Sequence, residues 1–398
     1  MKILHLSNIA GRLGGGVSQV VHALLRNQHR FGCDPTLFFI GKKEQETEIS
    51  KSENIDISHL NALPLRSFIK PSTFTNFISE TKDYKVIHQH GVFMPTSLFS
   101  FFLHKRKKII VSPHGYLEPE KMKISFLKKK IVLFLLERNN LKSCHCLIAC
   151  SYQEAKFLRD FGLTQPIAIL PNGVSDNFLT NEACKDHNNL LFRNKYGIAK
   201  DTKILLFLSR IHPFKGLDLL LRSIHKIKNQ FVDKNWVFVI AGIDELNHEN
   251  DLKLLVEELK LSKIVKFIGP QYAEDKIQVF DVASSFILPS KGENFGIAVI
   301  EALARGVPVI TTKNTPWKEL ETSKCGWWVD RTEEGFINVL SDLFCSTPKE
   351  LEDMGLKGVN LVKNKYTWSN IANQSSNIYQ WVANNFDDSY KKGFDLFD

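Results

Sequence analysis

Short apolar segments typical of buried strands alternate with helical segments along the whole chain of 398 residues. This alternation constrains the fold more than any other feature, because a strand that pairs in parallel with the next needs a crossover, usually a helix. The sequence has no repeat of fixed period and no low-complexity tract. Its length exceeds that of one compact core, so we expect two doubly wound, Rossmann-like parallel-sheet domains.

Eleven apolar segments are expected to form the strands. They lie near residues 2–6, 35–39, 85–88, 108–112, 146–150 and 166–170 in the first half, and near 203–209, 237–241, 265–268, 285–288 and 307–311 in the second. The Pro171-Asn-Gly-Val174 cluster between the halves is a turn signal and a plausible crossing point between domains. Residues beyond about Asp387 are expected to form a mobile tail.

The segment 285–306 carries the clearest chemical signal in the chain. It predicts a buried strand, a loop, and a helix from Gly296 to Arg305 that ends at Gly306. Free backbone N–H groups and the positive end of the helix dipole favour an anion at such a helix start. A diphosphate could therefore rest near residues 294–297 without a metal.

Two carboxylates flank this helix start. At a rise of 1.5 Å per residue, Glu293 and Glu301 are separated by roughly 7 Å along the helix axis, so each can accept hydroxyls from a different sugar. The alternative is a loop glutamate and a solvated helix glutamate, since Glu is a common helix former.

The seven residues between Glu293 and Glu301, with Asn-Phe-Gly directly after the first, make this stretch resemble the signature of retaining glycosyltransferases of family 4. That family has the GT-B fold. The resemblance implies an acceptor-side domain at 1–174, a donor-binding domain at 175–371, and a final segment, 372–398, that crosses back to the first domain. Trp368 and Tyr379 resemble the usual ending of the family.

The resemblance also implies residue roles. Glu293 contacts the donor sugar, Glu301 the ribose, and the backbone after Glu293 the sugar hydroxyls and phosphate. Other candidates follow predicted strands: the Arg210 and Lys215 pair for phosphate, the Gly14-Gly-Gly16 loop before a helix near Val17, and His114 for the donor sugar. The implied catalytic residues are Glu293, His114, Arg210 and Lys215, and the implied donor-binding residues are Gly15, Gly16, Arg210, Lys215, Asn294, Phe295, Gly296, Ile297 and Glu301.

Each of these candidates has a plainer reading. Arg210 and Lys215 could be exposed loop cations, and a lone His such as His114 is more often structural. His90 is a weaker candidate on the acceptor side. Glu319 could reach the ligand edge of the second domain, but a packed Trp317 and a solvated Glu319 are the simpler expectation.

The implied reaction is transfer of a sugar, with retained configuration, from a nucleoside diphosphate to a hydroxyl of a glycan or polyprenyl-diphosphate-linked acceptor. We expect no metal and no cofactor besides the donor substrate, since no Asp-x-Asp motif occurs. Thr315-Pro-Trp-Lys-Glu-Leu320 and Gly326-Trp-Trp328 resemble bacterial surface-polysaccharide enzymes of capsule, O-antigen, lipopolysaccharide or exopolysaccharide synthesis. The alternatives are a sugar-nucleotide 2-epimerase of the same fold and a catalytically inactive scaffold.

The formal net charge of +9 lies entirely in the first part of the chain. Residues 1–175 hold 24 Lys and Arg against 13 Asp and Glu, a balance of +11, whereas residues 176–398 carry −2. The basic residues concentrate at 105–130, next to the apolar run 131–136. This pattern favours peripheral contact with anionic lipid, or else a solvated basic face over a buried apolar side. No nucleic-acid recognition motif accompanies it.

The seven cysteines predict neither disulfides nor a metal site. Cys144, Cys146 and Cys150 lie in an apolar run, fit no ordinary zinc spacing, and are expected to pack in the core. The N-terminus reads as a first strand, because its apolar stretch is short and interrupted by His5. We therefore expect a cytoplasmic protein, with peripheral contact on the inner face of the plasma membrane as an option.

Overall fold

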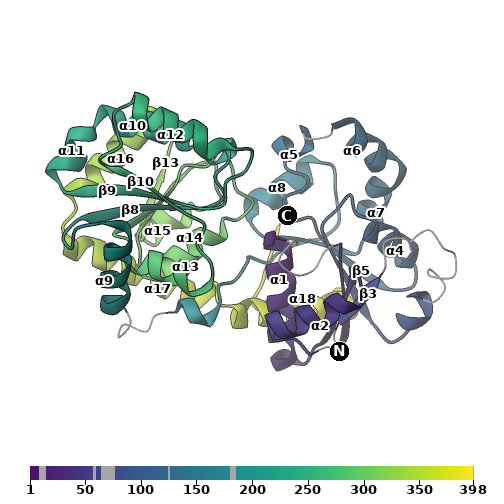
Figure 1. Ribbon diagram of the computed structural model, residues 1–398. Coiled ribbons are helices and arrows are strands. Elements are labelled where there is room, and N and C mark those ends of the chain that lie inside the picture. The colour runs from purple at the N-terminus through teal and green to yellow at the C-terminus, as the bar shows by residue number, and fades with distance from the viewer. Residues whose placement is uncertain (9–14, 57–59, 64–76, 124–125, 180–184, 398) are drawn as a thin grey trace. The chain divides into compact units, whose positions relative to one another are not determined.

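The computed structural model describes residues 1–8, 15–56, 60–63, 77–123, 126–179 and 185–397 (Figure 1). The chain forms two compact units. The first comprises Met1–Gly173 and Trp368–Asp398, and the second comprises Val174–Thr367. The C-terminal helix thus belongs to the first unit, as the sequence predicts.

The first unit is built on a sheet of eight described strands in the order β14-β7-β6-β5-β4-β1-β2-β3. Seven of them run parallel, and β14 pairs antiparallel with β7. The strands are β1 (Lys2–Ser7), β2 (Asp34–Ile40), β3 (Leu60–Leu63), β4 (Val86–His90), β5 (Lys108–Ser112), β6 (Cys146–Ala149), β7 (Ile167–Ile169) and β14 (Asp395–Phe397).

Alternate residues of these strands face two separate cores, because successive side chains point to opposite faces of a sheet. In β4, for example, Ile87 packs in one core and Val86 in the other. The second of these cores contains apolar residues of α1 and α18. The helices of this unit are α1 (Gly15–Gln28), α2 (Glu44–Glu53), α4 (Thr96–Leu103), α5 (Pro119–Lys123), α6 (Phe126–Val132), the π-helical turn η5 (Leu133–Glu137), α7 (Arg138–Ser143), α8 (Tyr152–Asp160) and α18 (Trp368–Ala383), with short 3₁₀ turns η2 (His29–Phe31) and η9 (Asp388–Tyr390).

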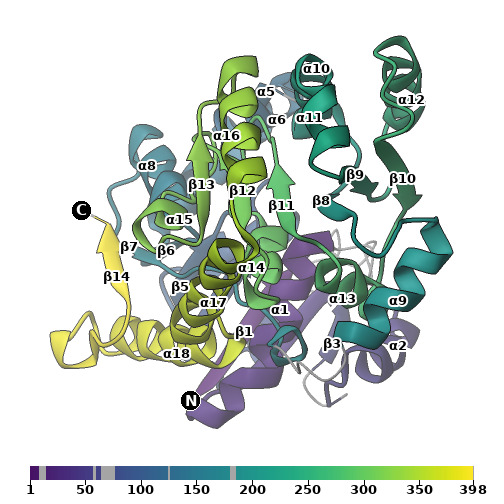
Figure 2. The ribbon, with the colours of Figure 1, turned by 90° about the vertical axis from the view of Figure 1, so that its left-hand side faces the viewer.

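The second unit contains a parallel sheet with strand order β10-β9-β8-β11-β12-β13, which Figure 2 shows in that sequence across the view. Its strands are β8 (Lys203–Leu208), β9 (Trp236–Ala241), β10 (Val265–Gly269), β11 (Ser285–Leu288), β12 (Val309–Thr312) and β13 (Gly326–Val329). Its helices are α9 (Lys185–Tyr196), α10 (Leu217–Lys226), α11 (Lys228–Asp233), α12 (His248–Glu258), α13 (Ala273–Asp281), α14 (Ile297–Ala304), α15 (Glu319–Thr322), α16 (Glu333–Cys345) and α17 (Pro348–Lys365), with 3₁₀ turns η6 (Asp176–Phe178) and η8 (Pro213–Lys215).

Local sequence explains where many of these helices begin. The helix α17 starts with a capping box, in which the Thr347 hydroxyl accepts from the Glu350 N–H and the Glu350 carboxylate accepts from the Thr347 N–H. Pro348 occupies the first helical position, where its missing N–H costs nothing. The helix α8 starts similarly at Ser151, whose hydroxyl accepts from the Glu154 N–H.

The expectation of a mobile tail beyond Asp387 is wrong. The strand β14 extends the sheet along β7, and Phe394 packs against Trp381 with ring centroids 5.6 Å apart. Two side chains of α8 also hold the strand: the Tyr152 hydroxyl donates to Asp395 (3.0 Å), and Arg159 donates to the carbonyl of Phe397 (3.0 Å). These long-range contacts order a segment whose own sequence carries little signal.

We expect Phe394→Ala to lower the free energy of unfolding by about 2–3 kcal/mol, because it removes a ring that is 9% exposed and belongs to the core of α1 and α18. Chemical denaturation followed by circular dichroism measures the change. Lys391→Ala, at an exposed position of the same segment, is the control and should leave the midpoint unchanged. Equal midpoints for both variants would mean that β14 contributes no stability.

Candidate functional site

The direction of strand addition reverses between β8 and β11 in the second sheet. Open parallel sheets bind ligands beyond the carboxyl ends of their strands at such a switch point, because the adjoining loops diverge there. The loop after β8 carries Arg210 and Lys215, and the loop after β11 carries Glu293. The topology therefore brings all three residues to one edge of one sheet.

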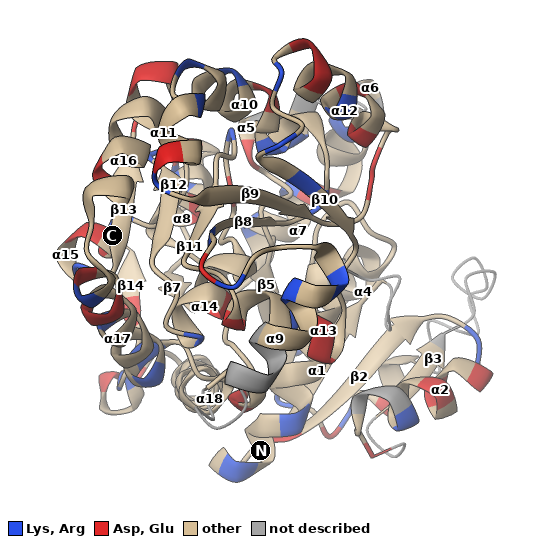
Figure 3. Cartoon of the chain, turned by 60° about the vertical axis from the view of Figure 1, so that its left-hand side comes forward, with Lys and Arg blue, Asp and Glu red and all other residues tan. Residues whose placement is uncertain are grey.

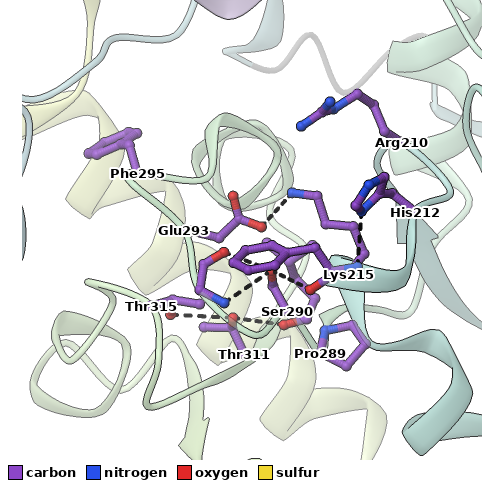
Figure 4. A network of polar contacts seen from close by, with 12 residues as sticks. Arg210, His212, Lys215, Pro289, Ser290, Glu293, Phe295, Thr311 and Thr315 are labelled. Carbon is purple, nitrogen blue, oxygen red and sulfur yellow. Dashed lines mark hydrogen bonds and ion pairs between the residues drawn. The ribbon is translucent and has the colours of Figure 1, made fainter. Parts of the chain in front are cut away.

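Hydrogen bonds hold the two loops together (Figure 4). The Lys291 N–H donates to the carbonyl of Phe214 (2.9 Å), which ties the β11 loop to the β8 loop. The Ser290 hydroxyl donates to the carbonyl of Gly292 (2.8 Å), and Thr312 donates to the carbonyl of Ser290 (2.8 Å). The backbone around Glu293 is therefore fixed before any ligand binds.

Gly216 lets the loops approach this closely. Its φ is +75°, and a Cβ atom there would lie 2.4 Å from the carbonyl oxygen of Pro289. A side chain would be strained by its backbone and would collide with the neighbouring loop. This glycine also caps α10 and so fixes the preceding turn η8, which carries Lys215.

Lys215 and Glu293 form the central ion pair of the site. The Lys215 Nζ lies 2.5 Å from Glu293 Oε1, and the two side chains are only 10% and 12% exposed (Figure 4). Removing a charge from water is costly, and the contact between these two opposite charges offsets part of that cost. The arrangement presents a cation and a hydroxyl acceptor side by side.

The helix α14 begins directly after this pair. Gly296, at φ +85°, is its N-cap, and Ile297 is its first residue. Phe295 is buried against Trp317, with ring centroids 5.1 Å apart, and the Trp317 indole N–H donates to the carbonyl of Phe295. Asn294 precedes them, half-buried, in the loop. Trp317, which lies outside the 293–301 signature, thus fixes the backbone just before the start of the helix.

Glu301, one turn into α14, is buried at 6% exposure and accepts from Lys276 of α13 at 2.5 Å. Its other carboxylate oxygen, Oε2, is buried with no hydrogen-bond partner among the described residues. An unsatisfied buried acceptor is costly, and a ligand hydroxyl would relieve that cost.

Arg210 pairs with an acidic side chain of the same unit. One of its terminal nitrogens donates to both carboxylate oxygens of Glu245 at 2.9 Å, and the arginine side chain is 61% exposed. An exposed pair of this kind is weak. A bound phosphate could therefore compete with Glu245 for the guanidinium.

In the first unit, His114 follows β5 in a strained turn. Its φ of +53° is uncommon for a residue other than glycine. The next residue, Gly115, donates its N–H to Glu154 (2.5 Å), whose other oxygen accepts from the Cys150 N–H (2.8 Å). Burial raises the pKa of Glu154, and burial lowers the pKa of His114 to about 4, so the imidazole is neutral at pH 7.

His114 and Glu154 line a small recess with His88, His90 and Asn172 of the same unit. Residues with a strained backbone are often found at functional sites. The expected loop glycines are not among its lining residues. Gly15 and Gly16 form the first turn of α1, slightly before the expected helix start near Val17, and Gly14 lies outside the described residues.

His5, His88 and His90 are a possible metal-binding group among the described residues, because their ligand atoms lie within 4.8 Å of one another. All six ring nitrogens, however, already have hydrogen-bond partners. The trio therefore forms part of a hydrogen-bonded network. Cys144 and Cys146 pack in the two apolar cores, and Cys150 is buried beside Glu154.

Several residues of the site carry no recognisable signal in the sequence. Lys276 and Glu245 reach Glu301 and Arg210 from other elements, and nothing in their local sequence indicates a partner. Glu154 fits a helix-capping pattern with Ser151, which hides its contact with Gly115. Glu319 is not simply solvated, since the Tyr366 hydroxyl donates to it and Lys365 pairs with it, whereas Trp317 is packed as expected.

Solved structures with the same architecture define the fold. The Anabaena protein HepE, in complex with UDP and glucose, aligns with a TM-score of 0.73 at 16% identity over 96% of this chain and 99% of its own. WaaG, a glycosyltransferase involved in lipopolysaccharide biosynthesis, aligns with a TM-score of 0.67 at 14% identity over 95% and 99%. The chain has the GT-B fold of two parallel-sheet α/β domains.

Family comparisons cover each unit separately. The family described as Glycosyltransferase Family 4 matches residues 14–178, and the family described as Glycosyl transferases group 1 matches residues 189–358. Together the two matches cover most of the chain and identify it as a family 4 type glycosyltransferase.

Among curated relatives, the D-inositol 3-phosphate glycosyltransferase of Corynebacterium jeikeium is 33% identical over 124 residues, 30% of each chain. The matches to the first curated relatives span about a third to a half of those proteins' length.

A double-mutant cycle tests the Lys215–Glu293 pair. We expect Glu293→Ala to lower the free energy of unfolding by about 2 kcal/mol, because it leaves a lysine charge unpaired in a site that is 10% exposed. The double variant Glu293→Ala/Lys215→Ala should recover part of this loss, with a coupling of about 1–3 kcal/mol. Denaturant titrations measure each corner of the cycle.

The exposed pair Lys313–Asp330, with side chains 43% and 66% exposed, provides the matched control and should show no measurable coupling. Additive effects at Lys215 and Glu293 would contradict the paired arrangement.

Proposed function

We propose that this protein is a metal-independent, retaining glycosyltransferase that moves a sugar from a nucleoside diphosphate donor to a hydroxyl of a glycan or lipid-linked acceptor. The observation that carries the proposal is the buried Lys215–Glu293 pair at the switch point of the second sheet, directly before the N-terminus of α14. This edge combines a cation, a helix start and hydroxyl acceptors, the groups that a sugar diphosphate requires.

Lys215 and the N-terminus of α14 supply the positive charge for the diphosphate in this proposal. The ammonium and the free N–H groups after Gly296 would bind phosphate oxygens and stabilise the charge that develops as the sugar leaves. Arg210 would add a second cation once a phosphate displaces Glu245.

The two glutamates would recognise hydroxyls. Glu293 would accept from the transferred sugar, and the unpartnered Oε2 of Glu301 would accept from the ribose. Glu301 is already oriented by Lys276, so binding needs little reordering of its side chain.

The bond between the anomeric carbon and the diphosphate oxygen breaks in this reaction, and a bond to the acceptor oxygen forms on the same face. The acceptor proton passes to the leaving phosphate. Lys215 balances the negative charge on that phosphate during the step, and Glu293 fixes the sugar.

The comparisons support the donor class. HepE was solved with UDP and glucose, and the relative from Corynebacterium jeikeium is named a D-inositol 3-phosphate glycosyltransferase. Incubation with a nucleotide sugar and no acceptor separates this proposal from an epimerase, since a transferase leaves the sugar configuration unchanged.

Binding of the diphosphate alone tests the donor site. We expect one of UDP, GDP, ADP and dTDP to raise the melting temperature of the protein, because a ligand of the folded state stabilises it. Lys215→Met should weaken that binding roughly ten- to a hundredfold, the equivalent of one hydrogen bond to a charged group.

Isothermal titration with the selected diphosphate measures the affinity of each variant. Lys313→Met removes an exposed lysine elsewhere on the same unit and should leave the affinity unchanged. No shift with any diphosphate at millimolar concentration, or equal affinities for native protein and Lys215→Met, would overturn the proposed donor site.

For the biological setting, we propose bacterial surface-polysaccharide synthesis at the inner face of the plasma membrane. Trp317 belongs to the segment that resembles such enzymes, and its indole N–H donates to the carbonyl of Phe295, close to Glu293 in the chain. The indole N–H of Trp328 donates to the carbonyl of Thr315 (3.1 Å). WaaG, with the same fold, is involved in lipopolysaccharide biosynthesis.

A surface patch on the first unit supports a lipid-linked acceptor. Four apolar side chains of α6 and η5, Leu127, Ile131, Phe134 and Leu135, are 60–77% exposed. The sequence left two alternatives open for the apolar run 131–136: a buried side under a basic face, or contact with lipid. The fold exposes Ile131, Phe134 and Leu135 of this run. Patches of this kind are rare on monomeric proteins unless they bind something.

Basic residues lie close to this patch in the sequence: Lys130 is exposed within α6, and Lys105 and Arg106 are exposed in the turn between α4 and β5. On the helices of the second unit, acidic and basic residues are interspersed (Figure 3). Basic and apolar residues together favour an anionic bilayer surface. No helix among the described residues is both long and apolar enough to cross a bilayer.

Phe134→Ser/Leu135→Ser should weaken binding to vesicles of phosphatidylcholine and phosphatidylserine about tenfold or more, because each side chain loses apolar burial in the interface. Vesicle sedimentation measures the bound fraction. The control Leu254→Ser/Leu356→Ser removes exposed leucines, 67% and 52% exposed, from the second unit and should bind as the native protein does. Equal binding by both double variants would contradict the membrane patch.

A further inference from the structure

Three histidines occupy positions in the first sheet where the strand pattern calls for apolar side chains. His5 of β1 and His88 and His90 of β4 follow Ile3 and Val86 at alternate positions, on the face that packs against α1 and α18. All three are at most 1% exposed. Buried polar side chains are tolerated only when they are hydrogen-bonded, so these histidines need defined partners.

The partners form a continuous chain that ends at His114. Gln28 Oε1 lies 3.0 Å from His5 Nε2, His5 Nδ1 lies 2.9 Å from His90 Nε2, and His90 Nδ1 lies 3.0 Å from His114 Nε2. The chain runs from the end of α1, across two strands, to the recess lined by His114.

The far end of the chain fixes its direction. The Ser375 hydroxyl donates to the carbonyl of Ala372 (2.8 Å), so its oxygen must accept from the Gln28 amide nitrogen (2.8 Å). That nitrogen also lies 3.2 Å from the Tyr379 hydroxyl. The Gln28 oxygen therefore faces His5, and because this oxygen only accepts, His5 Nε2 must carry a hydrogen.

Each imidazole then passes the same orientation to the next. Burial lowers the pKa of His5 and of His114 to about 4 and the pKa of His90 well below its usual value, so each ring is neutral and has a single N–H. His5 Nδ1 therefore accepts from His90 Nε2–H, and His90 Nδ1 accepts from His114 Nε2–H.

His88 forms a side branch. Its Nδ1 lies 2.8 Å from the Tyr379 hydroxyl, and its Nε2 lies 2.7 Å from the Ser112 hydroxyl. Burial raises the pKa of Tyr379, so its hydroxyl keeps its proton. Turning the Gln28 amide around would require Ser375 to give up the Ala372 carbonyl as its acceptor.

We propose that Gln28, held by Ser375 and Tyr379, is a positioning residue that sets the tautomer of His114 through His5 and His90. His114 Nε2–H is committed to the interior, and Nδ1, which has no partner among the described residues, is left as a hydrogen-bond acceptor for a substrate hydroxyl. This nitrogen cannot donate to a phosphate oxygen at neutral pH. The identity of the substrate rests on the proposed function, whereas the tautomer does not.

The test is a long-range ¹H–¹⁵N correlation spectrum of the ligand-free protein with labelled histidine at pH 7, its ring signals assigned by single His→Gln variants. We expect His5, His90 and His114 each to show a protonated Nε2 and an unprotonated Nδ1. A protonated Nδ1 at His114, or a doubly protonated ring, would overturn the proposal.

Gln28→Leu should convert His114 to a mixture of both tautomers, because His5 loses the acceptor that selects one of them. Asn27→Leu replaces a neighbouring amide that donates to the Ala23 carbonyl of its own helix and has no other partner among the described residues, and it should leave the spectrum of His114 unchanged. If Gln28→Leu does not fold, Ser375→Ala replaces it in the test. This variant removes the hydroxyl that holds the Gln28 amide, with less loss of packing, and should produce the same mixture of tautomers. An unchanged tautomer in the folded variant would remove Gln28 from this role.

Transfer assays separate the two levels of the argument. With equal tautomer populations, the apparent affinity of Gln28→Leu for the sugar donor falls about twofold, because only one tautomer binds. Absence of any transfer by the native protein, together with the expected spectrum, would defeat the proposed function and leave the histidine chain standing. Sugar transfer by the native protein, together with a protonated Nδ1 at His114, would support the proposed function and overturn the histidine chain.

Discussion

Parallel strand pairing is the constraint from which the rest of this structure follows. Because each parallel connection needs a crossover, all carboxyl ends of a sheet meet at one edge, and the loops there diverge where the strand order reverses. The reversal between β8 and β11 brings Lys215 and Glu293 together from positions 78 residues apart. The reversal at β1 and β4 in the first sheet likewise places His5 beside His90.

The two units solve the burial of polar groups in different ways. The second unit keeps its charges by pairing them, as Lys215 with Glu293 and Lys276 with Glu301. The attraction within each pair offsets the desolvation penalty of its charges only while both partners are present, so each lysine holds its glutamate in place. The result is a site whose charged groups are oriented in advance, at the edge where we propose that the donor binds.

The first unit instead keeps the histidines of its buried chain, His5, His90 and His114, neutral. Burial makes the imidazolium form costly, and a chain of neutral rings can satisfy every buried nitrogen only if all of them share one orientation. A single amide at Gln28 can therefore decide the hydrogen-bonding character of His114, which lies two rings away.

The sequence alone determined the two parallel-sheet domains, the strands with strong apolar runs, the helix after Gly296 and the family signature at Glu293 and Glu301, because periodicity and turn chemistry are local. Tertiary structure alone decided the partners. The fold pairs Arg210 with Glu245 and Glu301 with Lys276, orders residues 395–397 as a strand, and exposes the apolar side of α6. Such contacts join residues far apart in the chain, and their geometry depends on strand register and helix packing, which local patterns do not encode.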